Sequence, residues 1–143
     1  MSTSIIITQS NYIPWKGYFD NIAQVDKFVL FDSMQYTKRD WRNRNKIKTK
    51  SGTKWLTIPV EVKGKFNQAI KDTKIADKDW SIKHWDILKS HYSNCPHFKH
   101  NEEWVKELYK NCINFNYLGE TNLHFIKGIM NFFGIKTEII LDS

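Results

Sequence analysis

The sequence has few residues of the kinds that build disulfide frameworks, metal sites or membrane spans. It has two cysteines, Cys95 and Cys112, whose separation matches neither a disulfide framework nor a metal-binding motif. Its apolar runs are short, as in residues 28–31, so no segment is long enough to cross a bilayer. Residues 1–8 lack the basic region and the apolar stretch of a secretory signal. These absences lead us to expect a cytoplasmic protein.

The chain does have enough apolar and aromatic residues to form a core. Of its 143 residues, 41% are hydrophobic and 15% are aromatic, which excludes a disordered segment. This length suits one domain with a real core better than two domains. We therefore expect a single domain over residues 1–143.

Basic residues are concentrated in one segment, residues 38–54. Eight Lys or Arg side chains lie there against one acid, Asp40, and together they account for the whole formal charge of +7. The rest of the chain holds fourteen bases and fourteen acids. Such a segment attracts phosphate, whether on a nucleotide, a nucleic acid or a lipid headgroup.

The N-terminal part shows the pattern of a βαβ unit. The β-branched run within residues 4–8 predicts a buried strand, and residues 27–32 predict a second one. Between them, Tyr18 and Ile22 recur at helical spacing in a helix expected over residues 17–24. Strand, helix and strand together imply a parallel pair joined by a crossover.

A polar loop or a broken helix over residues 33–45 is expected next, followed by a hairpin. Residues 46–49 and 54–58 flank Ser51 and Gly52, which is a tight-turn signal between two short strands. The fold class we expect is α/β, with a βαβ start and a parallel sheet, an inserted hairpin, and helices toward the C-terminus.

Five further elements are expected after the hairpin. They are a short polar strand over residues 69–75, a helix capped by Asp77 or Asp79 and running to about Tyr92, a helix over residues 102–114, a helix over residues 121–133 that stops at Gly134, and a strand over residues 136–141. The apolar residues of that last strand require burial on both faces. We expect it either to insert between other strands or to belong to a fragment of a longer chain, and association through it is a further possibility.

Three blocks of residues resemble a known bacterial family. They are residues 12–20 with Gln9 ahead of them and Asp26 and residues 28–29 behind; Asp32, Gln35, Tyr36, Lys38, Trp41 and residues 43–48; and residues 55–60, followed by Ile70, Asp72, Trp80, Lys83 and His84. On these blocks the chain resembles the WbqC-like family, which is associated with the synthesis of O-antigen and other surface polysaccharides. Members of that family usually have proline where this sequence has Ser10. They also continue past residue 143, so the resemblance implies a C-terminally truncated domain.

The resemblance implies a pathway without implying a reaction. From the residues we expect a transferase or ligase that acts on a nucleotide-linked sugar, and nothing in the sequence identifies a cofactor. In open α/β sheets, ligands bind at the carboxyl ends of the strands. The segment after the first strand therefore predicts substrate or phosphate contacts by Gln9, Tyr12, Trp15, Lys16 and Asp20. The alternative is that the aromatic residues of this segment only pack in the core.

The basic segment is the second candidate for ligand binding. Amide side chains bind sugar hydroxyls or base edges, whereas Arg binds phosphate through two parallel hydrogen bonds. A pyrophosphate-linked sugar needs both kinds of contact. The residues expected to make them are Gln35, Tyr36, Lys38, Trp41, Arg42, Asn43, Arg44, Asn45 and Lys48. The alternative is an ordinary solvated basic surface.

Two residues are candidates for proton transfer. Asp32 ends the second expected strand and is predicted to point at the same crevice as the loop after the first strand. His84 is a candidate acid or base, and its alternative role is a hydrogen bond at a helix interface. We expect no metal site, because His84 and His91 are two helical turns apart and no other group completes a ligand set.

Two other functions remain open. Tyr36, Trp41 and Trp55 lie along the basic segment and predict stacking platforms for RNA or single-stranded nucleic acid. The apolar C-terminal strand would instead suit a non-catalytic partner in a polysaccharide-synthesis complex.

Overall fold

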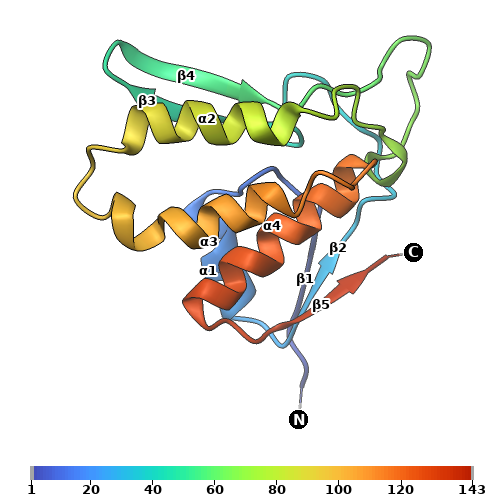
Figure 1. Cartoon of the computed structure of the whole chain (residues 1–143). Helices are drawn as coiled ribbons and strands as arrows, with labels where there is room; N and C mark the ends of the chain where they lie inside the picture. The colour runs from blue at the N-terminus through green and yellow to red at the C-terminus, as the bar shows by residue number, and fades with distance from the viewer. Residues whose placement is uncertain (1, 143) are drawn as a thin grey trace.

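A parallel sheet joins strands from the two ends of the chain. The computed structural model describes residues 2–142, and its first sheet consists of β1 (Ile5–Thr8), β2 (Lys27–Leu30) and β5 (Glu138–Leu141) in the order β1-β2-β5 (Figure 1). Both pairings are parallel, with Ile6 opposite Phe28 and Phe28 opposite Ile139. The expected α/β class and its βαβ start are confirmed.

Helix α1 (Lys16–Ala23) is the crossover between β1 and β2. Its buried residues Tyr18, Phe19 and Ile22 pack against Phe28 of β2, as their three-to-four spacing requires. The chain leaves β1 through residues 9–15, which form the loop at the carboxyl end of the sheet.

The expected hairpin is confirmed as β3 (Arg44–Thr49) and β4 (Gly52–Thr57), which pair antiparallel. The expected strand over residues 69–75 is wrong. Its centre is a single 3-10 turn, η1 (Ile70–Asp72), in which the Thr73 hydroxyl donates to the Ala69 carbonyl at 2.9 Å. A side chain that bonds to a nearby backbone carbonyl favours a turn over an extended ladder.

Three long helices complete the fold: α2 (Trp80–Tyr92), α3 (Phe98–Lys110) and α4 (Leu118–Phe133). Helix α3 begins four residues before the expected start, because Phe98 continues its apolar face and stacks on Trp85 of α2. Helix α4 ends as predicted at Gly134, which has φ +71°, a conformation that glycine adopts without a steric penalty.

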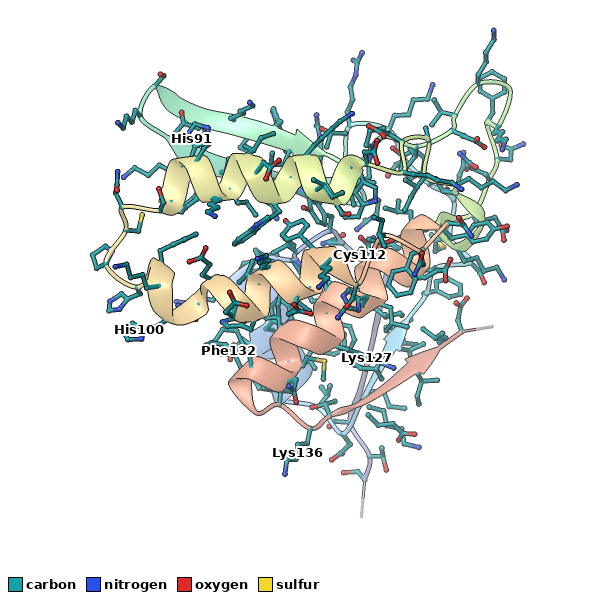
Figure 2. All side chains as sticks on the ribbon, in the orientation of Figure 1. His91, His100, Cys112, Lys127, Phe132 and Lys136 are labelled. Carbon is teal, nitrogen blue, oxygen red and sulfur yellow. The ribbon has the colours of Figure 1, made fainter. Side chains whose placement is uncertain are left out.

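The apolar residues form two clusters. One lies between the sheet and helices α1 and α4, and the other lies between α2, α3, α4 and the hairpin. Cys112 follows α3 and is fully buried in the second cluster (Figure 2). Burial raises the pKa of the Cys112 thiol to about 12, so this thiol stays protonated and unreactive.

Strand β5 extends the sheet beside β2 and does not insert between the other strands. Its side chains divide between the two faces of the sheet. Ile139 packs against the cluster under α1 and α4, whereas Ile140 points to the opposite face, in register with Val29.

Candidate functional site

The loop after β1 is anchored in the core by Tyr12. This side chain is buried, and its backbone N–H donates to the Trp41 carbonyl at 3.1 Å. Its hydroxyl lies 2.8 Å from Nδ1 of His84 and 2.5 Å from the hydroxyl of Tyr109. The loop is therefore held to α2 and α3 through one side chain.

The direction of these hydrogen bonds follows from the other nitrogen of His84. Nε2 lies 3.0 Å from the Thr57 carbonyl, which can only accept, so Nε2 carries the proton and Nδ1 accepts from Tyr12. The Tyr109 hydroxyl then donates to the Tyr12 oxygen. Burial lowers the pKa of His84 from 6.5 to about 4, which keeps the ring neutral at pH 7. Both ring nitrogens are engaged within the protein.

Two residues near this loop have left-handed backbone conformations that are unfavourable for their side chains. Ile13 has φ +45° and Arg39 has φ +58°. The Asn45 side chain donates to the Ile13 carbonyl at 2.6 Å, and the Arg44 guanidinium donates to the Arg39 carbonyl at 2.5 Å. Adjacent residues of β3 thus clamp both strained turns. Strain of this kind persists only where the surroundings over-determine it, and it is concentrated at functional sites.

The clamped loop forms one wall of a pocket of about 340 Å³, which we call the tryptophan pocket. Trp15 and Trp41 line it, with 69% and 46% of their surface exposed. The other lining residues are Asn11, Pro14 and Asn45. Two exposed indole faces with two amide side chains are suited to a flat or ring-shaped polar ligand.

Next to this pocket, two cationic side chains of β3 lie against a tryptophan of β4. Trp41 and Trp55 lie 5.4 Å apart between ring centroids, tilted by 47°. The guanidinium carbon of Arg44 lies 3.9 Å from the Trp55 ring centroid, and the Lys46 ammonium lies 4.8 Å from it. Within residues 2–142 neither cation pairs with a carboxylate, so both charges remain available to an anion.

Arg42 links the loop to the basic segment. Its guanidinium donates to the side-chain oxygens of Asn11 and, at 3.1 Å, Gln9. Asp40 lies 3.8 Å from it. The structure therefore brings Gln9 and Arg42 into contact, and Arg42 holds the loop in place.

Asp32 lies on the other side of the loop in a buried polar network. Its two carboxylate oxygens accept from the Ser10 backbone N–H at 2.8 Å and from the Ser10 hydroxyl at 2.7 Å. The Asn122 amide donates to the Ser10 hydroxyl at 3.0 Å and to the Arg42 carbonyl at 2.9 Å. Burial raises the pKa of Asp32, and the bonds from Ser10 oppose that rise.

A second pocket, of about 350 Å³, opens beside Asp32 at the carboxyl ends of β2 and β5. Lys71, Glu120 and Asp142 also line it. The network through Ser10 and Arg42 joins this pocket to the tryptophan pocket. Asp32 lines this second pocket, but the other proton-transfer candidate, His84, does not. His84 lies in the core between Tyr12 and Thr57.

The remaining predicted site residues are divided between the surface and the core. Lys16 and Asp20 are exposed on α1, where Asp20 accepts from Gln24. Asn43 is buried and donates to the Ile58 carbonyl at 2.9 Å. Lys48 is exposed on β3.

Three predicted residues lie together but apart from the tryptophan pocket. Gln35, Tyr36 and Lys38 line a separate hollow with Phe66, whose carbonyl accepts from Gln35 at 2.7 Å. The structure thus divides the predicted site into a loop and hairpin part and this second group.

Comparison with known proteins agrees with the resemblance seen in the sequence. The profile of the WbqC-like protein family matches residues 9–143. The chain belongs to the WbqC-like family. It is 47% identical over 135 residues to an uncharacterised protein of Mycobacterium tuberculosis, Rv1507c, and the match covers 94% of this chain and 58% of that relative. The chain therefore spans a little more than half the length of the relative. No solved structure matches it significantly.

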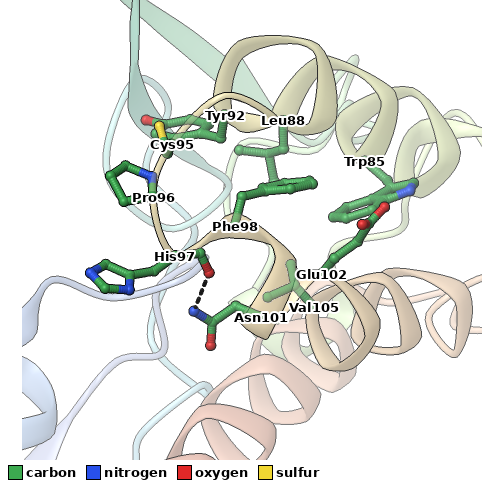
Figure 3. Close-up of a pocket in the computed structure, with 10 residues that line it drawn as sticks. All are labelled: Trp85, Leu88, Tyr92, Cys95, Pro96, His97, Phe98, Asn101, Glu102 and Val105. Atoms are coloured by element: carbon green, nitrogen blue, oxygen red, sulfur yellow. Dashed lines mark hydrogen bonds between the residues drawn. The ribbon is translucent and has the colours of Figure 1, made fainter.

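This WbqC-like chain has a third pocket, of about 350 Å³, between α2 and α3. Figure 3 shows Trp85, Leu88 and Phe98 on its walls and the Cys95–Pro96 turn at one end. Its polar rim is already paired, since Asn101 donates to the His97 carbonyl at 2.9 Å and Glu102 lies 3.7 Å from the Lys89 ammonium. The pocket is apolar and contains none of the predicted site residues.

Metal-binding clusters and membrane-spanning helices are both absent from residues 2–142 of the WbqC-like chain. No cluster of three His, Cys, Asp or Glu side chains is placed to hold a metal ion among them. No helix in that range is long and apolar enough to cross a membrane.

Sequence reasoning missed three residues of this site: Ser10, Tyr109 and Asn122. Ser10 attracted notice only as a departure from the proline usual in the WbqC-like family, yet its N–H donates to Asp32, which proline cannot do. Asn122 carried a usable signal. It lies on the apolar face of α4 at helical spacing from Leu118 and Phe125, where a buried amide requires a polar partner.

Proposed function

We propose that this WbqC-like chain binds a nucleotide-linked sugar in the pocket between Trp15 and Trp41. We further propose that it acts in the cytoplasm as a transferase or ligase in the synthesis of O-antigen or another surface polysaccharide. Family membership supports the pathway. The observation that carries the ligand class is the pocket itself, in which two exposed indoles and two amides lie beside the Arg44 and Lys46 cations.

Each part of the ligand has a counterpart in the site. An indole face stacks on a sugar ring or a base, and the amide nitrogen of Asn11, whose oxygen accepts from Arg42, can donate to a hydroxyl. The Lys46 ammonium and the Arg44 guanidinium offer positive charge for a diphosphate. The exposed Lys48, two residues beyond Lys46 on β3, adds a third cation.

Asp32 is the group that we assign to proton transfer. It lies in the adjoining pocket at the carboxyl end of β2, and burial shifts its pKa upward toward the range of a general acid or base. His84 supports the site from the core by fixing Tyr12, and in this proposal it does not contact the ligand.

A thermal-shift screen tests the proposal. The purified chain is heated with UDP-, dTDP-, GDP- and CMP-sugars, with ATP and with a short RNA. A ligand at about a hundred times its dissociation constant adds about 2.7 kcal/mol to the free energy of unfolding, which a melting curve detects easily. We expect stabilisation by one class of nucleotide-sugar, lost in Trp15→Ala and in Lys46→Ala.

The matched control is Phe66→Ala, an aromatic side chain that is 76% exposed and lies outside this pocket. Its ligand response should equal that of the wild type. Equal loss in Phe66→Ala and Trp15→Ala would contradict the assignment of the pocket.

A nucleic-acid module is the second candidate, favoured by the exposed Trp41 and Trp55 pair beside two cations. Stabilisation by RNA alone, falling steeply as salt is raised, would support it and overturn the nucleotide-sugar proposal.

A further inference from the structure

The parallel sheet has one covered face and one open face. Helices α1 and α4 both pack on the same side, against Phe28 and Leu30 of β2. In Figure 1 these helices lie to one side of β1, β2 and β5, and no helix formed by residues 2–142 lies on the other. Parallel sheets in α/β proteins are almost always covered on both faces.

The open face carries mainly apolar side chains. Side chains alternate along each strand, so Ile7, Val29 and Ile140, which are in register across the sheet, all point away from the helices. Ile5 is 52% exposed and Ile7 is 63% exposed, and Phe31 is also exposed at the end of β2. None of these five residues belongs to either apolar cluster. A contiguous apolar patch of this kind marks an interaction surface.

Two opposite charges on this face are arranged in a way that a second copy can match. Lys27 and Glu138 lie in register on adjacent strands, in the same row as Ile5. In an interface with two-fold symmetry, residue i of one copy meets residue j of the other, and j meets i. Lys27 of each copy can therefore face Glu138 of the other copy, which gives two such pairs in the dimer.

We propose that the open face of the β1-β2-β5 sheet binds a second copy of this chain. The symmetry axis runs parallel to the strands, between β2 and β5. Val29 then lies opposite Ile140 of the second copy, in the same way as the charged pair. The two sheets pack face to face at about 10 Å, as in other sheet-on-sheet layers.

The size of the face sets the strength of this association. Each strand has four residues, so the buried area falls below the roughly 800 Å² per partner of a standard stable interface. The dimer is accordingly in equilibrium with the monomer. This refines the association through the C-terminal strand expected from the sequence, because only Ile140 of its two isoleucines faces outward.

Sedimentation velocity over a concentration series of the intact chain tests the proposal. We expect a monomer at low micromolar concentration and a dimer as the concentration rises. Val29→Lys should raise the dissociation constant at least tenfold, because it places a charge on the central strand, opposite Ile140 of the second copy. Phe66→Lys is the matched control, with an exposed aromatic side chain far from this face in the sequence and outside the sheet, and should associate like the wild type.

A mixing experiment identifies the partner as a second copy. Lys27→Glu gives two acids on each face, and Glu138→Lys gives two bases, so each variant alone should dimerise more weakly than the wild type. An equimolar mixture of the two variants pairs acid with base twice and should form a heterodimer. Circular dichroism confirms that both variants are folded, and if one is not, the concentration series of Val29→Lys decides the test.

The possible outcomes separate clearly. Heterodimer formation in the mixture supports the proposal. A wild-type chain that stays monomeric at the highest concentration overturns it, as does unchanged association of Val29→Lys. A mixture no stronger than its separate components also overturns it, because the charged pair would then not face its counterpart.

Discussion

The hydroxyl of Tyr12 donates a hydrogen bond of 2.8 Å to Nδ1 of His84, and this bond ties the loop after β1 to helix α2. On the loop side, Tyr12 directly precedes the strained residue Ile13 and the pocket residues Pro14 and Trp15. A buried histidine thus sets the position of an exposed tryptophan without contacting the pocket itself.

Removing the Tyr12 hydroxyl should destabilise the fold. Tyr12→Phe leaves Nδ1 of His84 and the Tyr109 hydroxyl without their partner in a dry environment, which costs about 1–3 kcal/mol of unfolding free energy. Urea denaturation followed by tryptophan fluorescence measures the loss. Tyr36→Phe is the control, because within residues 2–142 the hydroxyl of this buried tyrosine makes no hydrogen bond. Equal losses in the two variants would contradict the role of the Tyr12 hydroxyl.

The stability of the protein should decrease with acidification between pH 6.5 and pH 4. The pKa of His84 is lowered by burial from 6.5 to about 4, so the unfolded chain takes up this proton first as the pH falls. The loss reaches about 3 kcal/mol at pH 4, since one pKa unit corresponds to about 1.4 kcal/mol.

Denaturation at several pH values measures that slope. In His84→Gln the contribution of this group to the slope should disappear, whatever the stability of the variant at pH 7. A slope that is the same in both proteins would show that His84 does not carry the effect.

The exposed and buried tryptophans should respond differently to truncation. Trp15→Ala should change the unfolding free energy by no more than about 0.5 kcal/mol, because its side chain lies mostly in solvent. Trp80→Ala should cost about 3–5 kcal/mol, because Trp80 is fully buried among Tyr12, Tyr109 and Phe125. Chemical denaturation distinguishes the two. A large loss in Trp15→Ala would mean that this residue stabilises the fold, and its effect on ligand binding could then not be assigned to the pocket alone.

Substitution of Asp32 should destabilise the fold. Asn has one acceptor oxygen where Asp32 uses two, so Asp32→Asn leaves one Ser10 donor without an acceptor and costs about 1–3 kcal/mol. Asp20→Asn, on the exposed face of α1, should change the stability by less than about 0.5 kcal/mol. Melting temperatures compare the pair, and similar values for both variants would argue against the buried network around Asp32.

Local patterns in the sequence predicted most of the secondary structure. Runs of isoleucine indicated the strands β1 and β5. Apolar residues at three-to-four spacing indicated the buried faces of helices α1 and α4. The prediction was wrong over residues 69–75, where a bond from Thr73 to Ala69 favours a turn. Periodicity does not register a bond of that kind.

The sequence by itself determined the α/β class, the hairpin, the basic segment and the family resemblance, because each depends on residues that are close together along the chain. Only the tertiary structure decided what the polar residues do. Asn45 donates to Ile13 across 32 positions, and Asn122 donates to Ser10 across 112. Composition indicates only that such a side chain needs a polar partner. The packing of distant segments decides which partner it has, and it made Asn45 a clamp and left Trp15 exposed.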